Sequence, residues 1–321
     1  MSKDCSTYHV PVLLTECLTQ LAIKPDGTYL DGTLGGAGHS QKILEQLGPA
    51  GRLICLDRDQ MALEAASLRL STTKSAAHYD LQQSDFASFD QVLEKLGVEK
   101  LDGVLLDLGV SSAQLDIAAR GFSYMEDGPL DMRMDQTCGK TAQDLVNQAS
   151  EEELADILWH YGEERYSARI AAAIVAAREQ RPISTTHELV KIITDSMPAK
   201  ARREKQHPAK RSFQALRIAV NDELGQLEVF LDKIPDYMAD EGRILIISFH
   251  SLEDRLVKQA MRDWEKPCSC PPDLPRCVCG KKSLGWAKPR KAILATEEEV
   301  QENPRARSAR LRVFVVNREK N

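Results

Sequence analysis

The sequence predicts an α/β protein whose doubly wound parallel sheet is interrupted by an all-helical domain. Strand and helix signals alternate up to Asp107, the pattern is then helical for roughly a hundred residues, and strand signals return near the C-terminus. At 321 residues the chain is long enough for two domains. We expect a discontinuous domain of residues 1–115 and 217–321 and an inserted domain of residues 116–216.

Short apolar segments predict five strands, at Thr28–Asp31, Arg52–Asp57, Gly103–Asp107, Arg243–Ser248 and Leu311–Val316. Helical patterns predict helices at residues 40–47, 60–70, 151–159 and 168–179. Because helices connect the first strands, these strands should be parallel and covered on both faces. Between residues 111 and 216 we find no convincing strand pattern.

Composition indicates a soluble globular chain with a sizeable core. Hydrophobic residues make up 42% and charged residues 28% of the sequence. No segment approaches the roughly 20 apolar residues of a membrane helix, and the polar N-terminus lacks a signal-peptide core. We expect a cytoplasmic protein without a membrane partner.

Charge is distributed unevenly along the chain. The net charge of −6 argues against a nucleic-acid binder, but residues 276–321 contain twelve Lys or Arg against five Glu. Residues 200–217 contain seven Lys or Arg against the single Glu204. These two basic stretches are where a polyanion could bind.

A glycine-rich turn, Asp31-Gly-Thr-Leu-Gly-Gly-Ala-Gly-His-Ser40, separates the first strand from the first helix. Glycines at this position let the backbone approach a ligand closely, which predicts a nucleotide or nucleoside site at the carboxyl edge of the sheet. The dinucleotide fingerprint GxGxxG is not met, because Gln41 stands where the third small residue is needed. This weakens the NAD interpretation.

Acidic residues end successive strands. Asp57 ends the second strand, where a carboxylate can accept both hydroxyls of a ribose, and Asp107 ends another strand at the same edge. Phe86 lies between them in the sequence and could flank an adenine ring. A glycine turn, a ribose-binding acid and an apolar ring describe S-adenosylmethionine better than a dinucleotide. The alternative is that these residues only cap, turn and pack.

Several long motifs resemble one bacterial family, in order and over nearly the whole chain. They are His9–Leu14, Asp31–Ser40, Leu106–Asp116, Arg120–Ser123, Asp127–Asp135, Ser248–Arg255 and Asn303–Ser308. The family is ribosomal RNA small subunit methyltransferase H. The resemblance implies a Rossmann-like methyltransferase sheet whose inserted helical domain recognises the substrate. It also implies S-adenosylmethionine as cofactor and N4-methylation of one cytidine in the decoding region of 16S ribosomal RNA.

The resemblance also assigns a cofactor site, which includes the glycine turn and both acidic strand ends. Its residues are Ala37, Gly38, His39, Asp57, Phe86, Asp107 and Gln114. The implied partner is 16S ribosomal RNA within the small ribosomal subunit, and a homodimer is left open.

Methyl transfer to a cytosine amino group needs an acceptor near the amino hydrogens. We rank Asp107 first and His250 second as catalytic residues, with the backbone of residues 108–111 as a further candidate. His250 could instead orient a loop. Residues 120–135 could close over the base with Phe122 or Tyr124 as stacking partners, or form a plain structural loop.

Four cysteines lie within twelve residues: Cys268, Cys270, Cys277 and Cys279. Four thiolates can hold a tetrahedral zinc ion, although C-x-C pairs are closer than the usual C-x₂₋₄-C spacing. We leave a structural zinc open against reduced thiols. We expect no catalytic metal, because the displacement needs no Lewis acid.

Two other function classes stay open at this point. A non-catalytic ribosome assembly factor would use the basic stretches but not the cofactor site. An NAD-dependent oxidoreductase would use the same fold with Asp57 on the ribose, but the incomplete fingerprint disfavours it.

Overall fold

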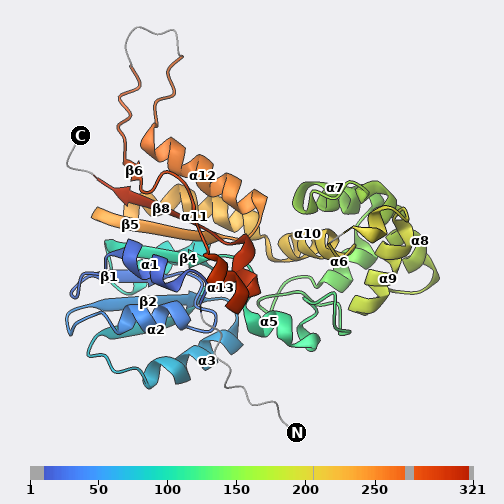
Figure 1. Ribbon diagram of the computed structural model, residues 1–321, viewed down its shortest axis with the longest axis horizontal. Coiled ribbons are helices and arrows are strands. Elements are labelled where there is room, and N and C mark those ends of the chain that lie inside the picture. Colours follow the sequence, from blue (N-terminus) through green and yellow to red (C-terminus); the bar gives the residue numbers. More distant parts are fainter. Residues whose placement is uncertain (1–10, 205, 272–277, 318–321) are drawn as a thin grey trace. The chain divides into compact units, whose positions relative to one another are not determined.

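The computed structural model describes residues 11–204, 206–271 and 278–317 (Figure 1). The chain divides into two compact units, one of residues 1–109 and 224–321 and one of residues 110–223. Among the described residues, no helix is long and apolar enough to cross a membrane. That these units are a cofactor domain and a substrate domain stays a prediction.

The first unit is built on one eight-stranded sheet with the order β3-β2-β1-β4-β5-β8-β6, to which β7 is added beside β8. Strands β1 to β5 run parallel, and β8 runs antiparallel to β5. The strands are β1 (Thr28–Asp31), β2 (Arg52–Asp57), β3 (His78–Gln83), β4 (Leu101–Asp107), β5 (Met238–Ser248), β6 (Gly285–Ala287), β7 (Ile293–Leu294) and β8 (Arg310–Val316). Since β1 lies between β2 and β4, the winding reverses there.

Helices cover both faces of this sheet, which confirms the predicted doubly wound α/β fold. They are α1 (Leu14–Leu21), α2 (Gly38–Leu44), α3 (Gln60–Ser71), α4 (Phe89–Lys95), α11 (Glu223–Tyr237), α12 (Ser251–Glu265) and α13 (Glu297–Glu302), with 3-10 turns η1 (Phe86–Ser88) and η4 (Pro304–Ser308). Side chains of α1, α2 and α3 pack on one face, and those of α4, α11 and α12 pack on the other.

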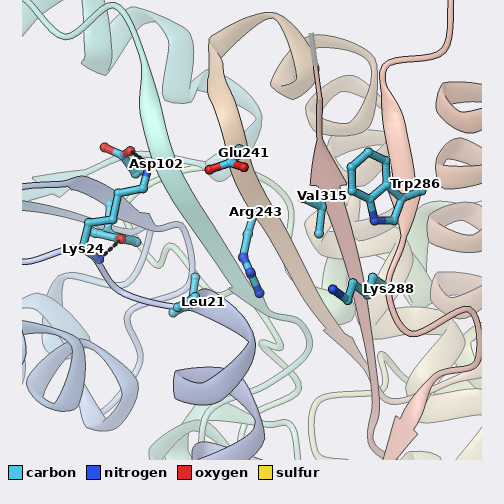
Figure 2. A pocket seen from close by; sticks show the side chains of 10 residues that line it. Leu21, Lys24, Asp102, Glu241, Arg243, Trp286, Lys288 and Val315 are labelled. Carbon is cyan, nitrogen blue, oxygen red and sulfur yellow. Dashed lines mark hydrogen bonds and ion pairs between the residues drawn. The ribbon is translucent and has the colours of Figure 1, made fainter. Parts of the chain in front are cut away.

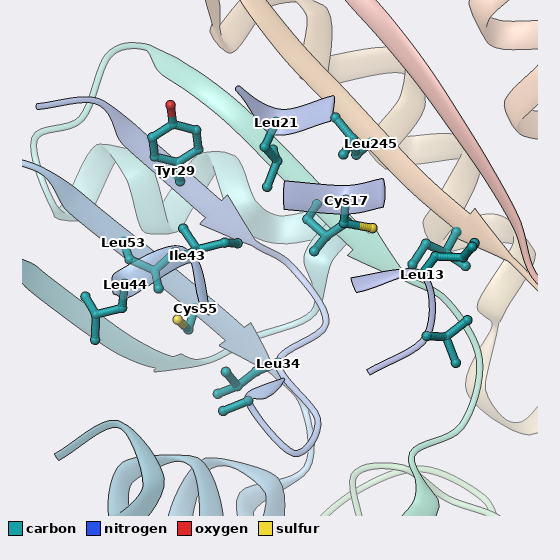
Figure 3. Packing of buried hydrophobic residues seen from close by; sticks show 14 of the residues in the cluster. Leu13, Cys17, Leu21, Tyr29, Leu34, Ile43, Leu44, Leu53, Cys55 and Leu245 are labelled. Atoms are coloured by element: carbon teal, nitrogen blue, oxygen red, sulfur yellow. The ribbon is translucent and has the colours of Figure 1, made fainter. Parts of the chain in front are cut away.

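Successive side chains of each strand point to opposite faces of the sheet, so each strand contributes to two cores. On β5, Leu245 and Ile247 belong to the first core, and Ile244 and Ile246 belong to the second. Figure 3 shows part of the first core, where Cys17 and Leu245 are among the labelled residues. Because both faces are buried, the strands are continuous apolar runs rather than alternating ones.

The second unit is helical around its own core. Its elements are α5 (Ser112–Asp116), η2 (Ala118–Arg120), α6 (Ala142–Gln148), α7 (Glu151–Gly162), α8 (Ser167–Gln180), α9 (Thr186–Ser196), η3 (Ala201–Arg203) and α10 (Lys210–Asn221). Capping boxes start α6, with Thr141 and Asp144, and α9, with Thr185 and Glu188. Leu154, Leu158 and Ile170 are fully buried in the core of this unit.

The sequence prediction missed β3. Its residues, His78-Tyr-Asp-Leu-Gln-Gln83, are half polar, and none of them is fully buried at this edge of the sheet. An edge strand needs fewer apolar residues than a central one, so its pattern does not stand out. The helix predicted at residues 40–47 begins earlier, at Gly38, and ends at Leu44.

Candidate active site

The carboxyl ends of β1, β2 and β4 meet at one edge of the sheet. Asp31, Asp57 and Asp107 each end one of these strands, and β1 is paired with both β2 and β4. This is the point where the winding reverses, and ligands of doubly wound folds bind there. The structure therefore brings together three acids that lie far apart in the sequence.

The glycine turn between β1 and α2 is fixed by the backbone. Gly32 N donates to Leu105 O over 3.0 Å, and Leu34 N donates to Leu56 O over 2.9 Å. Ala37 has a φ of 57°, in the left-handed region. A Cβ at Gly38 would lie 2.2 Å from Cγ of Pro11, whereas a Cβ at Gly36 would meet nothing within 4 Å. Packing thus explains Gly38, and Gly36 faces open space.

Asp31 anchors the first turn of α2 to the end of β1. Its Oδ2 accepts from Ser40 Oγ over 2.6 Å, and its Oδ1 accepts from Thr33 N over 3.2 Å. Burial raises the pKa of Asp31 to about 6, although these hydrogen bonds oppose the shift. This supporting role was not predicted, because nothing in the sequence pairs Asp31 with Ser40.

Asp57 supports the same turn from β2. Its Oδ2 accepts from Gly35 N over 2.8 Å, and its Oδ1 accepts from Asp59 N over 2.9 Å. Burial raises the pKa of Asp57. Because a carboxylate offers about four lone-pair positions, two remain for another partner.

His39 is buried beside Asp107. Its Nε2 lies 3.0 Å from Val12 O, a carbonyl that can only accept, so Nε2 carries the hydrogen. Burial lowers the pKa of His39 to about 4, so the ring is neutral at pH 7. Its other nitrogen, Nδ1, lies 3.7 Å from Asp107 Oδ2. The two residues therefore do not form an ion pair at neutral pH.

Asp107 is fixed by a hydrogen bond from its backbone N–H, and not by hydrogen bonds to its carboxyl group. Its N donates to Thr33 Oγ1 over 2.5 Å. Burial, followed by the negative charges of Asp31 and Glu253, raises the pKa of Asp107 to about 8. Its Oδ1 is buried and has no hydrogen-bond partner among the described residues, although the side chain as a whole is 25% exposed. An unpartnered buried acceptor at a ligand-binding edge indicates a functional group.

Phe86 follows the carboxyl end of β3. It begins η1, is partly buried, and contacts Phe230 edge to face with ring centroids 5.9 Å apart. The structure thus places this predicted adenine neighbour at the same edge of the sheet as Asp57.

His250 begins α12 as its N-cap. Its Nδ1 accepts from Glu253 N over 3.5 Å, and Glu253 Oε2 accepts in return from the backbone of Phe249 and His250. The His250 side chain is 9% exposed, and its Nε2 lies 3.2 Å from Glu253 Oε1. Nδ1 of His250 thus serves as the helix cap, whereas its buried Nε2 has no hydrogen-bond partner among the described residues.

Gln114 belongs to the second unit. It is 5% exposed, and its Oε1 accepts from Ser111 N over 3.0 Å in the capping box of α5. Its cofactor role stays a prediction from the resemblance.

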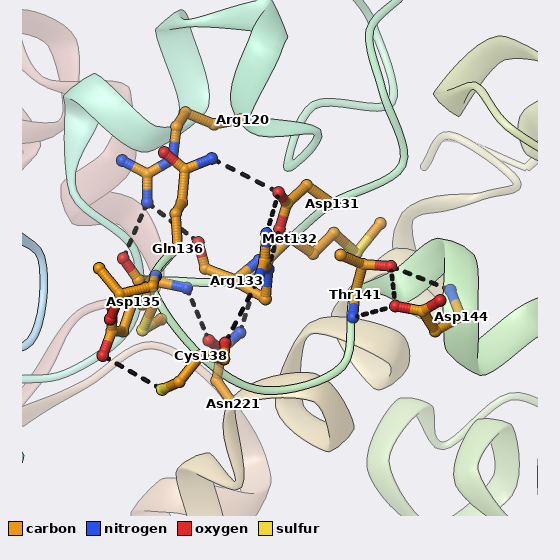
Figure 4. Close-up of polar contacts among 12 residues, drawn as sticks. Arg120, Asp131, Met132, Arg133, Asp135, Gln136, Cys138, Thr141, Asp144 and Asn221 are labelled. Atoms are coloured by element: carbon orange, nitrogen blue, oxygen red, sulfur yellow. Dashed lines mark hydrogen bonds and ion pairs between the residues drawn. The ribbon is translucent and has the colours of Figure 1, made fainter.

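The segment from Arg120 to Asp135 is a hydrogen-bonded loop (Figure 4). Arg120 Nη2 donates to the carbonyls of Arg133 and Met134, over 3.0 and 2.9 Å. Asn221 of α10 bonds both Met132 O and Met134 N over 2.8 Å. These contacts favour the structural interpretation of this loop.

The two aromatic residues suggested as base-stacking partners are engaged within the second unit. Phe122 is 5% exposed and packs in the core of that unit, so its proposed stacking on the base is wrong. Tyr124 stacks on His207 with ring centroids 4.8 Å apart.

A separate cavity of about 280 Å³ lies at the amino ends of β1, β4 and β5 (Figure 2). Its lining includes Lys24, Asp102, Glu241 and Arg243, and Lys24 Nζ donates to Asp102 Oδ1 over 2.9 Å. This cavity contains none of the predicted site residues, since those lie at the carboxyl ends of the strands.

The strand order, the glycine turn and the acidic strand ends define a doubly wound α/β protein with a ligand site at its switch point. The model of the MraW methylase family matches residues 6–317. The chain belongs to the MraW methylase family, and it is a methyltransferase.

Two relatives share about half of its residues. Ribosomal RNA small subunit methyltransferase H of Symbiobacterium thermophilum is 53% identical over 308 residues, 96% of each chain. The protein with the same name from Lachnospira eligens is 52% identical over 306 residues, 95% of this chain and 96% of its own.

Among solved structures, an rRNA methylase from Streptococcus thermophilus aligns over 97% of this chain and 100% of its own. It does so with 10% identity and a TM-score of 0.42. Because that likeness is low, the fold assignment rests on the strand order.

Proposed function

We propose that this methyltransferase moves the methyl group of S-adenosylmethionine to N4 of one cytidine in the decoding region of 16S ribosomal RNA. Membership of the family supports methyl transfer, and the relatives' name supports small-subunit RNA. The cytidine and its N4 atom come from the motif resemblance. The observation that carries the proposal is the buried, unpartnered Oδ1 of Asp107 beside the glycine turn.

The residues at the sheet edge fit this cofactor. When bound, S-adenosylmethionine supplies an electrophilic methyl group on a positively charged sulfur. Open space at Gly36 leaves room beside the backbone of the turn, and Asp57 retains acceptor positions for two ribose hydroxyls. Phe86 offers a partly exposed ring to an adenine. Ala37, Gly38, His39 and Gln114 complete the proposed cofactor set, and their place in it rests on the resemblance.

Asp107 is the proposed proton acceptor. In the transfer a carbon–nitrogen bond forms, the carbon–sulfur bond breaks, and the amino nitrogen loses one proton. A neighbouring positive charge lowers the pKa of a carboxyl, so Asp107 ionises when a cationic ligand binds. His39, fixed on Val12 O, is a positioning residue that keeps a neutral ring against Asp107. His250 remains the second candidate, although its cap geometry favours a structural role.

Cofactor affinity is expected to depend on pH through Asp107. The pKa of about 8 means that the free carboxyl is mostly protonated at pH 7, and binding of a cation then releases that proton. The affinity for S-adenosylmethionine should therefore rise with pH, by up to about tenfold per unit, and level off above about pH 8. Calorimetry from about pH 6.5 to 8.5 measures this dependence.

S-adenosylhomocysteine is the matched control for this measurement, because its sulfur is uncharged. Its affinity should change much less with pH, and Asp107→Asn should flatten the curve for S-adenosylmethionine. His39, with a pKa of about 4, does not titrate between about pH 6.5 and 8.5. Asp31, with a pKa of about 6, adds to the pH dependence only at the acidic end of this range. Equal slopes for the two ligands would contradict the proposed ionisation of Asp107.

A basic cavity supports RNA binding by the first unit. It measures about 480 Å³ and lies at the N-terminus of α12, where Arg255, Lys258, Arg307 and Arg310 line it. Asp254 is the only acid among its lining residues, and it is paired with Arg312 over 2.7 Å. In the second unit, Arg202 and Arg203 are exposed on η3. An RNA backbone is bound first through such charges.

Replacing Arg203 and Arg307 with Gln is expected to flatten the salt dependence of RNA affinity. Each lost contact with a single strand lowers the log–log slope by about 0.7, so the pair should lower it by about 1.4. The matched control replaces Lys74 and Lys95, which are also exposed but lie outside both basic stretches. Equal slopes in the two double variants, measured by fluorescence anisotropy, would place the RNA elsewhere.

Methyl-labelled cofactor tests the proposed activity. We expect label to enter unmodified small-subunit RNA, offered either as naked RNA or as assembled small subunits. A non-catalytic assembly factor would bind the RNA without transferring label, and an oxidoreductase would instead bind NAD and transfer no label. We also propose that the protein is cytoplasmic.

A further inference from the structure

Three cysteine thiols lie close together in the segment between α12 and β6. They belong to Cys268, Cys270 and Cys279, and their Sγ atoms all lie within 4.8 Å of one another. Cys279 Sγ lies 3.8 Å from Cys268 Sγ. Methyl transfer uses none of these residues, so this cluster needs a separate explanation.

The distances match a metal centre better than a disulfide. In a tetrahedral zinc site with Zn–S bonds of about 2.3 Å, the sulfur atoms lie about 3.8 Å apart. The sulfur atoms of a disulfide lie about 2.05 Å apart. The separation of 3.8 Å between Cys279 Sγ and Cys268 Sγ is a thiol-to-thiol hydrogen bond in this structure, and it also has the length of a tetrahedral edge.

The surroundings of the thiols also suit thiolates. Val278 N lies 3.4 Å from Cys270 Sγ and donates to it, as backbone amides commonly do around metal-bound sulfur. Lys266, Lys281 and Lys282 are exposed and lie two or three positions from these cysteines in the sequence.

This segment has little apolar material to hold it in place. Val278 is 79% exposed, and the described residues from 266 to 283 include no fully buried side chain. Its C-terminal end is tied to α12 by a backbone hydrogen bond, which Leu284 N donates to Trp264 O over 2.9 Å. Short segments without a core are commonly fixed by a metal or by disulfides.

We propose that Cys268, Cys270 and Cys279 supply, as thiolates, three of the four ligands of a zinc ion. The ion would join the two ends of the segment between α12 and β6 and would have a structural role only. Each thiol loses its proton on binding, so zinc uptake releases protons. Cys277 lies outside the described residues. The proposal is independent of the proposed RNA substrate and of the cofactor site.

Metal content of the purified full-length chain tests this directly. After expression with added zinc and exhaustive dialysis, we expect elemental mass spectrometry to find one zinc ion per chain. The Cys268→Ser, Cys279→Ser double variant should fall to background. Cys138→Ser is the matched control, because Cys138 is also an exposed thiol but donates to Asp135 in the other unit. It should keep its zinc.

Two further readouts do not depend on folding of the double variant. Cobalt substituted into the wild-type chain should show the thiolate-to-cobalt absorption of a tetrahedral site. A chelator should make residues 266–284 more sensitive to limited proteolysis. The loop around Cys138 should be cleaved at the same rate with and without the chelator. A wild-type chain without stoichiometric zinc, or with iron or copper in its place, would overturn the proposal.

Discussion

Asp107→Asn is expected to slow single-turnover methyl transfer by about 10²–10⁴-fold, the range that is typical of a lost general base. Asparagine keeps the size of the side chain but cannot take up a proton from the amino group. Because Asp107 Oδ1 has no partner among the described residues, the substitution should leave the fold intact. Rapid-quench measurements at saturating cofactor and RNA give the rate of the chemical step.

Asp102→Asn is the control on the same strand. Asp102 lies near the amino end of β4, where its carboxylate accepts from Thr28 N over 3.0 Å and from Lys24. Its loss should change the rate by less than about twofold. If Asp107→Asn lowers only the affinity and saturating cofactor restores the rate, Asp107 merely anchors the cofactor. A large loss in His250→Ala with Asp107→Asn near wild type would reverse the ranking of the two residues.

Asp57→Ala is expected to weaken cofactor binding by about tenfold to a hundredfold. Charge-assisted hydrogen bonds to the ribose contribute roughly 1.5–3 kcal/mol, which corresponds to that range in affinity. The variant also loses the bonds from Gly35 N and Asp59 N, so part of the effect could come from the turn. Calorimetric titration with S-adenosylhomocysteine measures the total loss.

A cofactor analogue separates these two contributions. A 2′-deoxy form of S-adenosylhomocysteine should bind the wild type more weakly but lose less additional affinity than the parent ligand on Asp57→Ala. Asp59→Ala removes the N-cap of α3, whose side chain accepts from Met61 N over 3.1 Å. It should cost about 1 kcal/mol of stability and little affinity. If Asp57→Ala folds normally and binds both ligands like the wild type, the ribose assignment is wrong.

The central fold was predictable because buried parallel strands produce continuous apolar runs. The segments 28–31 and 52–57 were predicted with the bounds that the structure gives. Such runs are visible without any partner, since both faces of each strand are covered. β3 was not predictable in this way, because its half-polar residues lie at an edge. The short strands β6 and β7 were also not predictable, because they form by pairing with β8 and have no strand pattern of their own in the sequence.

The candidate site was only partly predictable, because a sequence gives residue types and not their partners. The acids at the strand ends follow from the pattern of β2 and β4. The bond from Ser40 to Asp31 and the neutral ring of His39 beside Asp107 depend on the folded turn. Phe122 shows the opposite case, since an aromatic residue in a polar loop suggested stacking and instead fills the core of the second unit.

The identity of the methylated atom tests the central claim most directly. Small subunits that lack the modification are incubated with the enzyme and methyl-labelled cofactor, and the RNA is digested to nucleosides for mass spectrometry. We predict that the label is found in N4-methylcytidine, at a single decoding-region position, and that Asp107→Asn forms it far more slowly. Label in 5-methylcytidine, on a ribose hydroxyl or in another base would contradict this account of the reaction.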